Sequence, residues 1–411
     1  MSNTVILGAG IVGCSTAYYL SESPHTQAQS IHLVEPSPEL FHCASGLAGG
    51  FLAADWFAPS VTPLGALSFK LHKELAEKYD GKRKWGYSPS TGTSLSLDSD
   101  VVGGSGEDFL RNGTSRAQAA GARPARGANG PAWLTMAEDA SLEIISRENS
   151  TAQVDPLRFS RFLLDECLSR GVQLHHPARA ISVSKDVKDT LASVRMCAED
   201  GTESDLPCTR IVITAGAWSP KVLSTLFPSA NTRIPTAPLA GHSLLLKNPH
   251  YNPEAEENGC HAVFATDTLG FSPELFSRVG GEIYIAGLNS TQISLPDVAT
   301  DIKPDDRAIK RLKDCAAAMV NLPEGGEGMH VLRESLCFRP VTSSGRPIIS
   351  RIPDEKLGVG MSTRGDNEGG VFVAAGHGAW GISQAPGTGL CMAELIEGRP
   401  TSANIQALSL R

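Results

Sequence analysis

Residues 4–20 of the chain read TVILGAGIVGCSTAYYL, and residues 31–35 read IHLVE. This order predicts a strand over 4–7, a glycine turn, a helix over 14–20, a second strand over 31–34 and an acid at its end. The three glycines of G-x-G-x-x-G allow the tight bend, the approach of backbone to a pyrophosphate, and close packing of helix on strand. The helix N-terminus then binds the phosphate, and the acid binds a ribose hydroxyl. We therefore predict a dinucleotide site formed by Gly8, Gly10, Ile11, Val12, Gly13, Glu35 and Pro36.

The composition of the 411 residues is that of a globular protein with room for two domains. Glycine is in excess, with 41 residues or about one in ten, against an average of about 7%. A net charge of −8 argues against nucleic acid or an acidic membrane as the main partner, and no apolar run is long enough to span a bilayer. The nine cysteines form no C-x-x-C pair and the histidines have no ligand spacing. We therefore expect reduced thiols and no metal site.

Beyond residue 35 the chain alternates between helical and extended patterns. Helices are predicted over 64–79, 156–171, 305–320 and 383–396, with a further one from Trp218, and strands over 172–175, 178–184, 191–197, 211–216 and 371–375. Residues 234–289 are rich in strand patterns without a βαβ rhythm. Residues 98–131 hold many glycines and alanines but few large apolar side chains, so we predict a mobile loop there.

The first glycine turn does not distinguish NAD from FAD, but two later stretches favour FAD. Residues 43–51 read CASGLAGGF, and residues 371–382 read VFVAAGHGAWGI, a buried strand that enters a glycine turn before a helix. A second helix N-terminus suits the pyrimidine end of a flavin, where reduction adds negative charge, and has little use beside a nicotinamide. A nicotinamide-dependent Rossmann dehydrogenase is the alternative enzyme class. A non-catalytic flavoprotein with a role in trafficking or assembly is the alternative outside enzymes.

Five blocks of sequence resemble the D-amino-acid oxidase superfamily of flavoproteins, which includes glycine oxidase and sarcosine oxidase. They are GAGIVG with Glu35, ASGLAGG, IVITAGAWSP, CFRPVTSSGRPIIS and VFVAAGHGAWGISQAPGTG, and they stand in family order between residues 5 and 396. The segment ASGLAGGFLAADW, followed by LSFKLHKELAEKYDG, is similar to the sequences of a fungal branch of oxidoreductases in that superfamily.

The resemblance implies FAD in an extended conformation and an α/β fold with α+β character in its second domain. A Rossmann-type FAD-binding domain would be interleaved with a mixed-sheet substrate domain. We expect the first at 1–60, 151–233 and 330–411, and the second at 61–150 and 234–329. Beyond the first turn, the resemblance assigns these residues to the cofactor: Ser45, Gly46, Leu47, Gly49, Gly50, Ala180, Ile181, Ala215, Gly216, Trp218, Cys337, Arg339, Gly376, His377, Gly378, Ala379, Trp380, Gly381 and Ile382.

The resemblance also implies a reaction in which a hydride leaves the carbon beside an amine nitrogen for flavin N5. The imine then hydrolyses, and O2 reoxidises the flavin to give H2O2. The substrate would be a small amine or amino acid, and no acid–base residue is required because the flavin carries the chemistry. Arg339 is the first candidate for substrate contact, since glycine-oxidase-like relatives present an arginine here that forks onto a carboxylate; a structural hydrogen-bonding role is the alternative. A second arginine of some relatives is absent, which leaves room for a bulkier or less anionic amine.

Cys337 aligns with a cysteine that some relatives bond to the flavin 8α-methyl, yet FRPVT after it resembles the non-covalent branch. A covalent link and a buried thiol both stay open. His377 and Trp380 either shape the turn or contact substrate, and a protonated His377 would stabilise an anionic flavin. Residues 283–289 offer no lysine that aligns with the oxygen-activating lysine of sarcosine oxidases. An oxidase and a dehydrogenase therefore both stay open.

The two ends of the sequence bear on the compartment. The apolar start lacks the basic region that a signal peptide needs. The end, Ser409-Leu410-Arg411, departs from the Ser-Lys-Leu peroxisomal address. We therefore expect a cytoplasmic protein rather than a peroxisomal or exported one, and we make no prediction of its oligomeric state.

Overall fold

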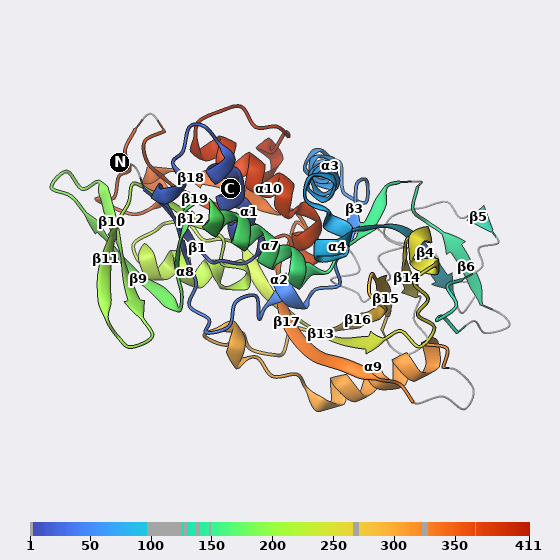
Figure 1. Ribbon diagram of the computed structural model, residues 1–411. Helices are drawn as coiled ribbons and strands as arrows, with labels where there is room; N and C mark the ends of the chain where they lie inside the picture. Colours follow the sequence, from blue (N-terminus) through green and yellow to red (C-terminus); the bar gives the residue numbers. More distant parts are fainter. Residues whose placement is uncertain are drawn as a thin grey trace.

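The computed structural model describes residues 3–96, 125–126, 130–135, 140–147, 149–265, 271–322, 328–365 and 367–411. The loop predicted over 98–131 lies outside these ranges except for 125–126 and 130–131. Two large sheets and a small three-stranded one organise the described chain, and Figure 1 shows the two large sheets next to each other, with α9 below the second.

The first sheet has six strands in the order β18-β19-β12-β1-β2-β8. Its five parallel strands are β1 (Thr4–Leu7), β2 (Ile31–Val34), β8 (Gln173–His175), β12 (Arg210–Ile213) and β19 (Gly370–Ala375). The edge strand β18 (Ile348–Ile352) runs antiparallel to β19. In chain order the parallel strands are arranged 3-2-1-4-5, which is the Rossmann arrangement and confirms the first half of the predicted fold class.

Both faces of this sheet are covered, which explains why its strands read as unbroken apolar runs. One face carries helices: α1 (Ile11–Glu22), α3 (Thr62–Tyr79), α7 (Pro156–Ser169) and α10 (Gly381–Ile396). The other face carries α8 and a three-stranded antiparallel sheet: α8 (Ser219–Leu226), β9 (Ala178–Lys185), β10 (Leu191–Ala198) and β11 (Glu203–Pro207). The predicted helices over 14–20 and 383–396 begin earlier in the structure, at Ile11 and Gly381.

The second sheet is mixed, and its main path is β17-β13-β16-β15-β14-β4-β6-β5. The strands on this path are β4 (Ser88–Ser96), β5 (Ala125–Arg126), β6 (Ser141–Ile144), β13 (Thr236–Lys247), β14 (Cys260–Ala265), β15 (Glu274–Arg278), β16 (Glu282–Ser290) and β17 (Val331–Thr342). The strands β3 (Phe51–Ala53) and β7 (Thr151–Gln153) pair beside it. The mixed sheet confirms the second half of the predicted fold class.

Alternation along the central strands of the second sheet separates an outer core from the wall of the site. Leu275, Ile283 and Ile285 pack with α9 (Asp306–Met319) on the outer face. Phe276 and Tyr284 point to the opposite face and pack with Phe51 of β3. The second sheet therefore turns an aromatic surface toward the residues that precede β3.

Sheet membership bears on the predicted domain boundaries. The strand β17 begins at Val331, inside the segment 330–411 that was assigned to the FAD-binding domain, but it pairs along β13 in the second sheet. We propose that residues 330–342 belong to the second domain, and that α3, which packs against α10 in the core of the first sheet, belongs to the FAD-binding domain.

Within the described ranges, none of the helices is both long and apolar enough to cross a membrane.

A pH-dependent stability follows from His72, which lies fully buried between α3 and α10. Its Nε2 lies 2.9 Å from the Ile382 carbonyl oxygen, and burial lowers its pKa to about 4. The ring therefore confers stability above about pH 6.5 that is lost as the pH falls toward 4, since the unfolded ring binds a proton first.

We expect urea unfolding of His72→Gln to show a shallower loss of stability between pH 7 and pH 5 than the original protein, by about 2 kcal/mol, since each proton contributes about 1.4 kcal/mol per pH unit. The exposed His25 provides the matched control variant, His25→Gln. Parallel profiles for His72→Gln and the original protein would show that the buried ring does not couple folding to pH.

Candidate functional site

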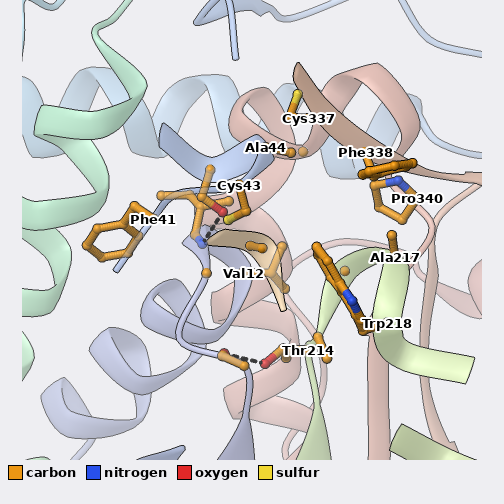
Figure 2. Close-up of a pocket in the computed structure, with 18 of the residues that line it drawn as sticks. Val12, Phe41, Cys43, Ala44, Thr214, Ala217, Trp218, Cys337, Phe338 and Pro340 are labelled. Carbon is orange, nitrogen blue, oxygen red and sulfur yellow. Dashed lines mark hydrogen bonds between the residues drawn. The ribbon is translucent and has the colours of Figure 1, made fainter. Parts of the chain in front are cut away.

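The glycine turn between β1 and α1 is held by contacts that leave no room for side chains. Gly8 has a φ of +108°, and its N–H donates to the Val34 carbonyl at 2.9 Å. A Cβ on Gly13 would lie 2.0 Å from the Gly8 carbonyl oxygen. The Thr214 hydroxyl, just after β12, donates to that same oxygen at 2.9 Å (Figure 2). The turn is therefore fixed at the carboxyl ends of β1 and β12, the switch point where open α/β sheets bind ligands.

Ser45 and Glu35 accept hydrogen bonds from backbone N–H groups at the start of α1. Ser45 Oγ, from α2 (Ala44–Leu47), accepts the Ile11 N–H at 2.9 Å. Glu35 Oε2 accepts the Ala9 N–H and Oε1 accepts the Ser37 N–H, each at 3.0 Å. Burial raises the pKa of Glu35. Each carboxylate oxygen can accept a further hydrogen bond, so Glu35 can bind a ligand hydroxyl while it holds the turn.

A single cavity runs from this turn to the aromatic face of the second sheet. Most of the predicted site residues line it: Gly8, Gly10, Ile11, Val12, Glu35, Pro36, Ser45, Gly49, Gly50, Ala180, Ile181, Ala215, Gly216, Trp218, Cys337, Arg339, His377, Gly378, Ala379, Gly381 and Ile382. Residues separated by more than 300 positions thus meet in one space.

Five predicted site residues lie off the cavity lining, namely Gly13, Gly46, Leu47, Gly376 and Trp380. The glycines among them serve packing. A Cβ on Gly46 would lie 2.4 Å from the Phe41 carbonyl oxygen, and Gly376 has a φ of +81° at the end of β19. These positions shape the backbone beside the cavity.

The chemistry along the cavity fits a dinucleotide. Glu35 lies at one end, the start of α1 lies beside Gly10, and Phe276 and Tyr284 line the far end. A Cβ on Gly10 would lie 2.9 Å from Ser45 Oγ, so only glycine keeps the backbone open there. An acid, a helix N-terminus and a flat apolar wall are the groups that a ribose, a pyrophosphate and an aromatic ring require.

Arg339 reaches the cavity across the neighbouring strand. Its guanidinium lies over Gly241 of β13, where a Cβ would lie 2.0 Å from Nη1. The same Nη1 donates to Oδ1 of Asn289 on β16. The lack of a side chain at Gly241 therefore leaves space for the guanidinium, and the hydrogen bond to Asn289 orients it.

Cys337 also lies on the cavity side of β17. Figure 2 shows it with Phe338 and Pro340 at one side of the cavity, while Trp218 lies at another. The thiol is buried, and burial raises its pKa. A neutral thiol is a weak nucleophile.

His377 and Trp380 differ in their surroundings. His377 is buried, its Nε2 lies 3.0 Å from Thr388 Oγ1, and burial lowers its pKa to about 4. Desolvation therefore favours the neutral ring over the protonated ring that would stabilise an anionic flavin. Trp380 packs against Phe57, with ring centroids 4.8 Å apart, and forms part of an aromatic cluster behind the cavity.

Sequence reasoning missed several cavity residues. Glu274, Phe276 and Tyr284 come from the strand-rich region, and Thr214 and Phe338 stand next to predicted residues. Alternation in residues 274–278 was the available signal, but it does not say which face points inward. Among the described residues, no group of three or more His, Cys, Asp or Glu side chains is placed to hold a metal ion.

The role of Glu35 is tested by Glu35→Ala. The change removes the acceptor of the Ala9 and Ser37 N–H groups, so we expect the affinity for FAD to fall by about tenfold to a hundredfold, the loss of a charged hydrogen bond. Titration of the apoprotein with FAD, followed by flavin fluorescence, measures this. The exposed Glu203 on β11 serves as the control Glu203→Ala. Equal affinities for the original protein and Glu35→Ala would remove Glu35 from the site.

Comparison with known proteins agrees with this geometry. The curated relative "Putative oxidoreductase C1F5.03c" of Schizosaccharomyces pombe is 28% identical over 425 residues, covering 99% of this chain and 97% of that protein. Iminodiacetate oxidase from Chelativorans sp. BNC1 superposes with a TM-score of 0.71 at 19% identity, over 99% of each chain. Glycine oxidase from Geobacillus kaustophilus gives 0.69 at 20% identity, over 100% of this chain and 98% of that one. At these identities the two structures show the fold.

A family model described as FAD dependent oxidoreductase, DAO, matches residues 3–395. This match spans the turn, both large sheets and all of α10 except its last residue, and it decides between the two cofactors that the first turn left open. The chain belongs to the DAO family of FAD-dependent oxidoreductases, with FAD as its cofactor.

Proposed function

We propose that the chain oxidises the C–N bond of an amine or amino acid at the end of the cavity lined by Arg339. The observation that carries this proposal is the guanidinium itself, half-buried in the same cavity as the glycine turn and oriented by Asn289. An oriented guanidinium suits a carboxylate, which it binds through two parallel hydrogen bonds. Glycine oxidase and iminodiacetate oxidase, two structural neighbours, are named for carboxylated amines.

When bound, FAD supplies the acceptor for the hydride that leaves the carbon beside the nitrogen. The residues of this chain then have three tasks. Glu35 and the start of α1 hold the cofactor, Arg339 orients the substrate, and the aromatic wall at Phe276 and Tyr284 keeps water from the reacting carbon. Neutral His377 borders the same space and offers a hydrogen-bonding ring without a charge.

The turn before α10 departs from relatives with a second arginine, since Gly378, Ala379 and Trp380 stand there. Gly378 and Ala379 line the cavity and add no charge. We therefore propose a substrate with one carboxylate and a nitrogen substituent larger than a methyl group. O2 is the proposed oxidant, and because the sulfur atoms of the nine cysteines are all free, we propose a reducing compartment such as the cytoplasm.

Anaerobic mixing of the purified holoprotein with a panel of secondary amines and amino acids tests the proposal. We expect at least one carboxylated amine to bleach the flavin absorbance. The variant Arg339→Met should lower the second-order rate of bleaching by about a hundredfold, the cost of leaving a carboxylate without its partner. Gly241→Ala should have a similar effect because its Cβ displaces the guanidinium.

The matched control is Arg195→Met, since Arg195 pairs with Asp205 on the far three-stranded sheet. No bleaching across the panel would contradict the enzymatic proposal and favour the non-catalytic flavoprotein. Bleaching that is insensitive to Arg339→Met would remove Arg339 from substrate binding. Readmission of air then separates an oxidase, which recovers its colour at once, from a dehydrogenase.

We also propose that FAD is bound without a covalent link to Cys337, since burial keeps its thiol protonated. Acid precipitation should give a colourless pellet and a yellow supernatant. The variant Cys337→Ser should retain FAD under native conditions to the same extent as the original protein. Flavin that stays with the acid pellet, and leaves it in Cys337→Ser, would establish the thioether instead.

A further inference from the structure

The backbone of Ala48, Gly49 and Gly50 lines the cavity, and two side chains hold the outer side of this loop. Arg278 Nη2 donates to the Ala48 carbonyl at 2.6 Å and to the Gly49 carbonyl at 3.1 Å, and Arg278 Nε lies 3.3 Å from the Gly49 oxygen. Gln153 Nε2 donates to the same Gly49 oxygen at 2.6 Å. Two consecutive carbonyls are thus fixed by side chains from strands β15 and β7. We call Arg278 and Gln153 the carbonyl clamp.

Arg278 is a buried charge, with 3% of its side chain exposed. The charged groups around it are Glu282, whose Oε2 lies 3.7 Å from Nη1, Asp155 and the like-charged Arg333. The Tyr284 ring lies beneath its guanidinium, 5.3 Å from centroid to Cζ. Arg333 Nε and Nη2 are themselves buried without a hydrogen-bond partner in the described chain. The formal charges of these four charged groups cancel, and Arg278 is the one among them that donates hydrogen bonds to the loop beside the cavity.

The direction of the carbonyls fixes the direction of the next N–H groups. In a trans peptide the C=O and N–H point to opposite sides. Because the Ala48 and Gly49 carbonyls point to Arg278, which does not line the cavity, the N–H groups of Gly49 and Gly50 point to the cavity side. Neither N–H has a protein acceptor in the described part of the chain.

The strand β15 and the glycines make this arrangement specific. Phe276 and Arg278 lie on one face of β15, two residues apart. A Cβ on Gly49 would lie 2.6 Å from Phe276 Cδ2, and Gly50, with a φ of +88°, would place a Cβ 2.0 Å from the Val154 carbonyl. Phe276 thus packs against the loop at Gly49, while Arg278 donates hydrogen bonds to the carbonyls of Ala48 and Gly49.

We propose that Arg278 is a positioning residue that turns the Gly49 and Gly50 N–H groups toward the isoalloxazine of FAD and favours its reduced state through the buried positive charge. Two-electron reduction with uptake of one proton adds one negative charge to the ring. Fixed donors and a nearby cation in a site of low dielectric stabilise that charge. The inference requires bound FAD but no particular substrate, so it stands or fails separately from the proposed amine oxidation.

The test compares midpoint potentials and FAD affinities of holoprotein variants by dye-coupled reduction and fluorescence titration. Arg278→Met should lower the potential, since reduced FAD loses more affinity than oxidised FAD. A tenfold difference between these losses corresponds to about 30 mV for a two-electron couple. Gln153→Leu removes a donor to the Gly49 carbonyl without changing charge, so it should weaken FAD binding and lower the potential by less than Arg278→Met does.

Glu282→Gln provides a change of opposite sign at a partly exposed residue outside the clamp, and it keeps the test valid if Arg278→Met does not fold. Removing this counter-charge should raise the potential. Arg195→Met again serves as the remote control. Potentials of Arg278→Met and Glu282→Gln that both equal that of the original protein would overturn the electrostatic role. An unchanged FAD affinity in folded Arg278→Met and Gln153→Leu would overturn the positioning role.

Discussion

The contact between Gly13 and the carbonyl of Gly8 is the constraint on which the site depends. No side chain fits between α1 and β1 at this point, because a Cβ would lie 2.0 Å from the carbonyl oxygen. The close approach puts the start of α1 at the switch point between β1 and β12, and Thr214 locks the same oxygen from the other side. Ser45 and Glu35 then take up the neighbouring N–H groups. The phosphate end of the cavity is thus built almost wholly from backbone, and its side chains serve to orient that backbone.

The other end of the cavity is built from side chains rather than from backbone. The second sheet contributes side chains, which alternate between an apolar core against α9 and a surface turned to the loop before β3. Phe276, Tyr284 and Arg339 all reach the cavity from this surface. Glycine has a second use here, because Gly241 and Gly49 make room for the guanidinium of Arg339 and for the ring of Phe276. The glycine excess of the sequence is partly explained by these close contacts.

The local parts of this arrangement could be predicted from sequence, while the long-range parts could not. The turn, α1, β2 and Glu35 lie within 35 residues, where spacing alone defines the unit. Arg339 and the turn before α10 needed a resemblance to a known family. Asn289, Gly241 and Arg278 act through pairing among β13, β15, β16 and β17, and nothing in a single strand shows which strand lies beside it. The neutral state of His377 depends on burial by residues far along the chain, so the motif around it could not indicate its charge.

The account depends most directly on where the flavin lies, and a crystal structure of the holoprotein measures this. It should show FAD extended through the cavity, with a ribose at Glu35, the pyrophosphate at the start of α1, and the isoalloxazine beside the Gly49–Gly50 backbone and facing Arg339 of the second sheet. The electron density should be interrupted between the Cys337 sulfur and the ring. A flavin bound elsewhere, or an isoalloxazine turned away from Arg339 and the second sheet, would contradict the account.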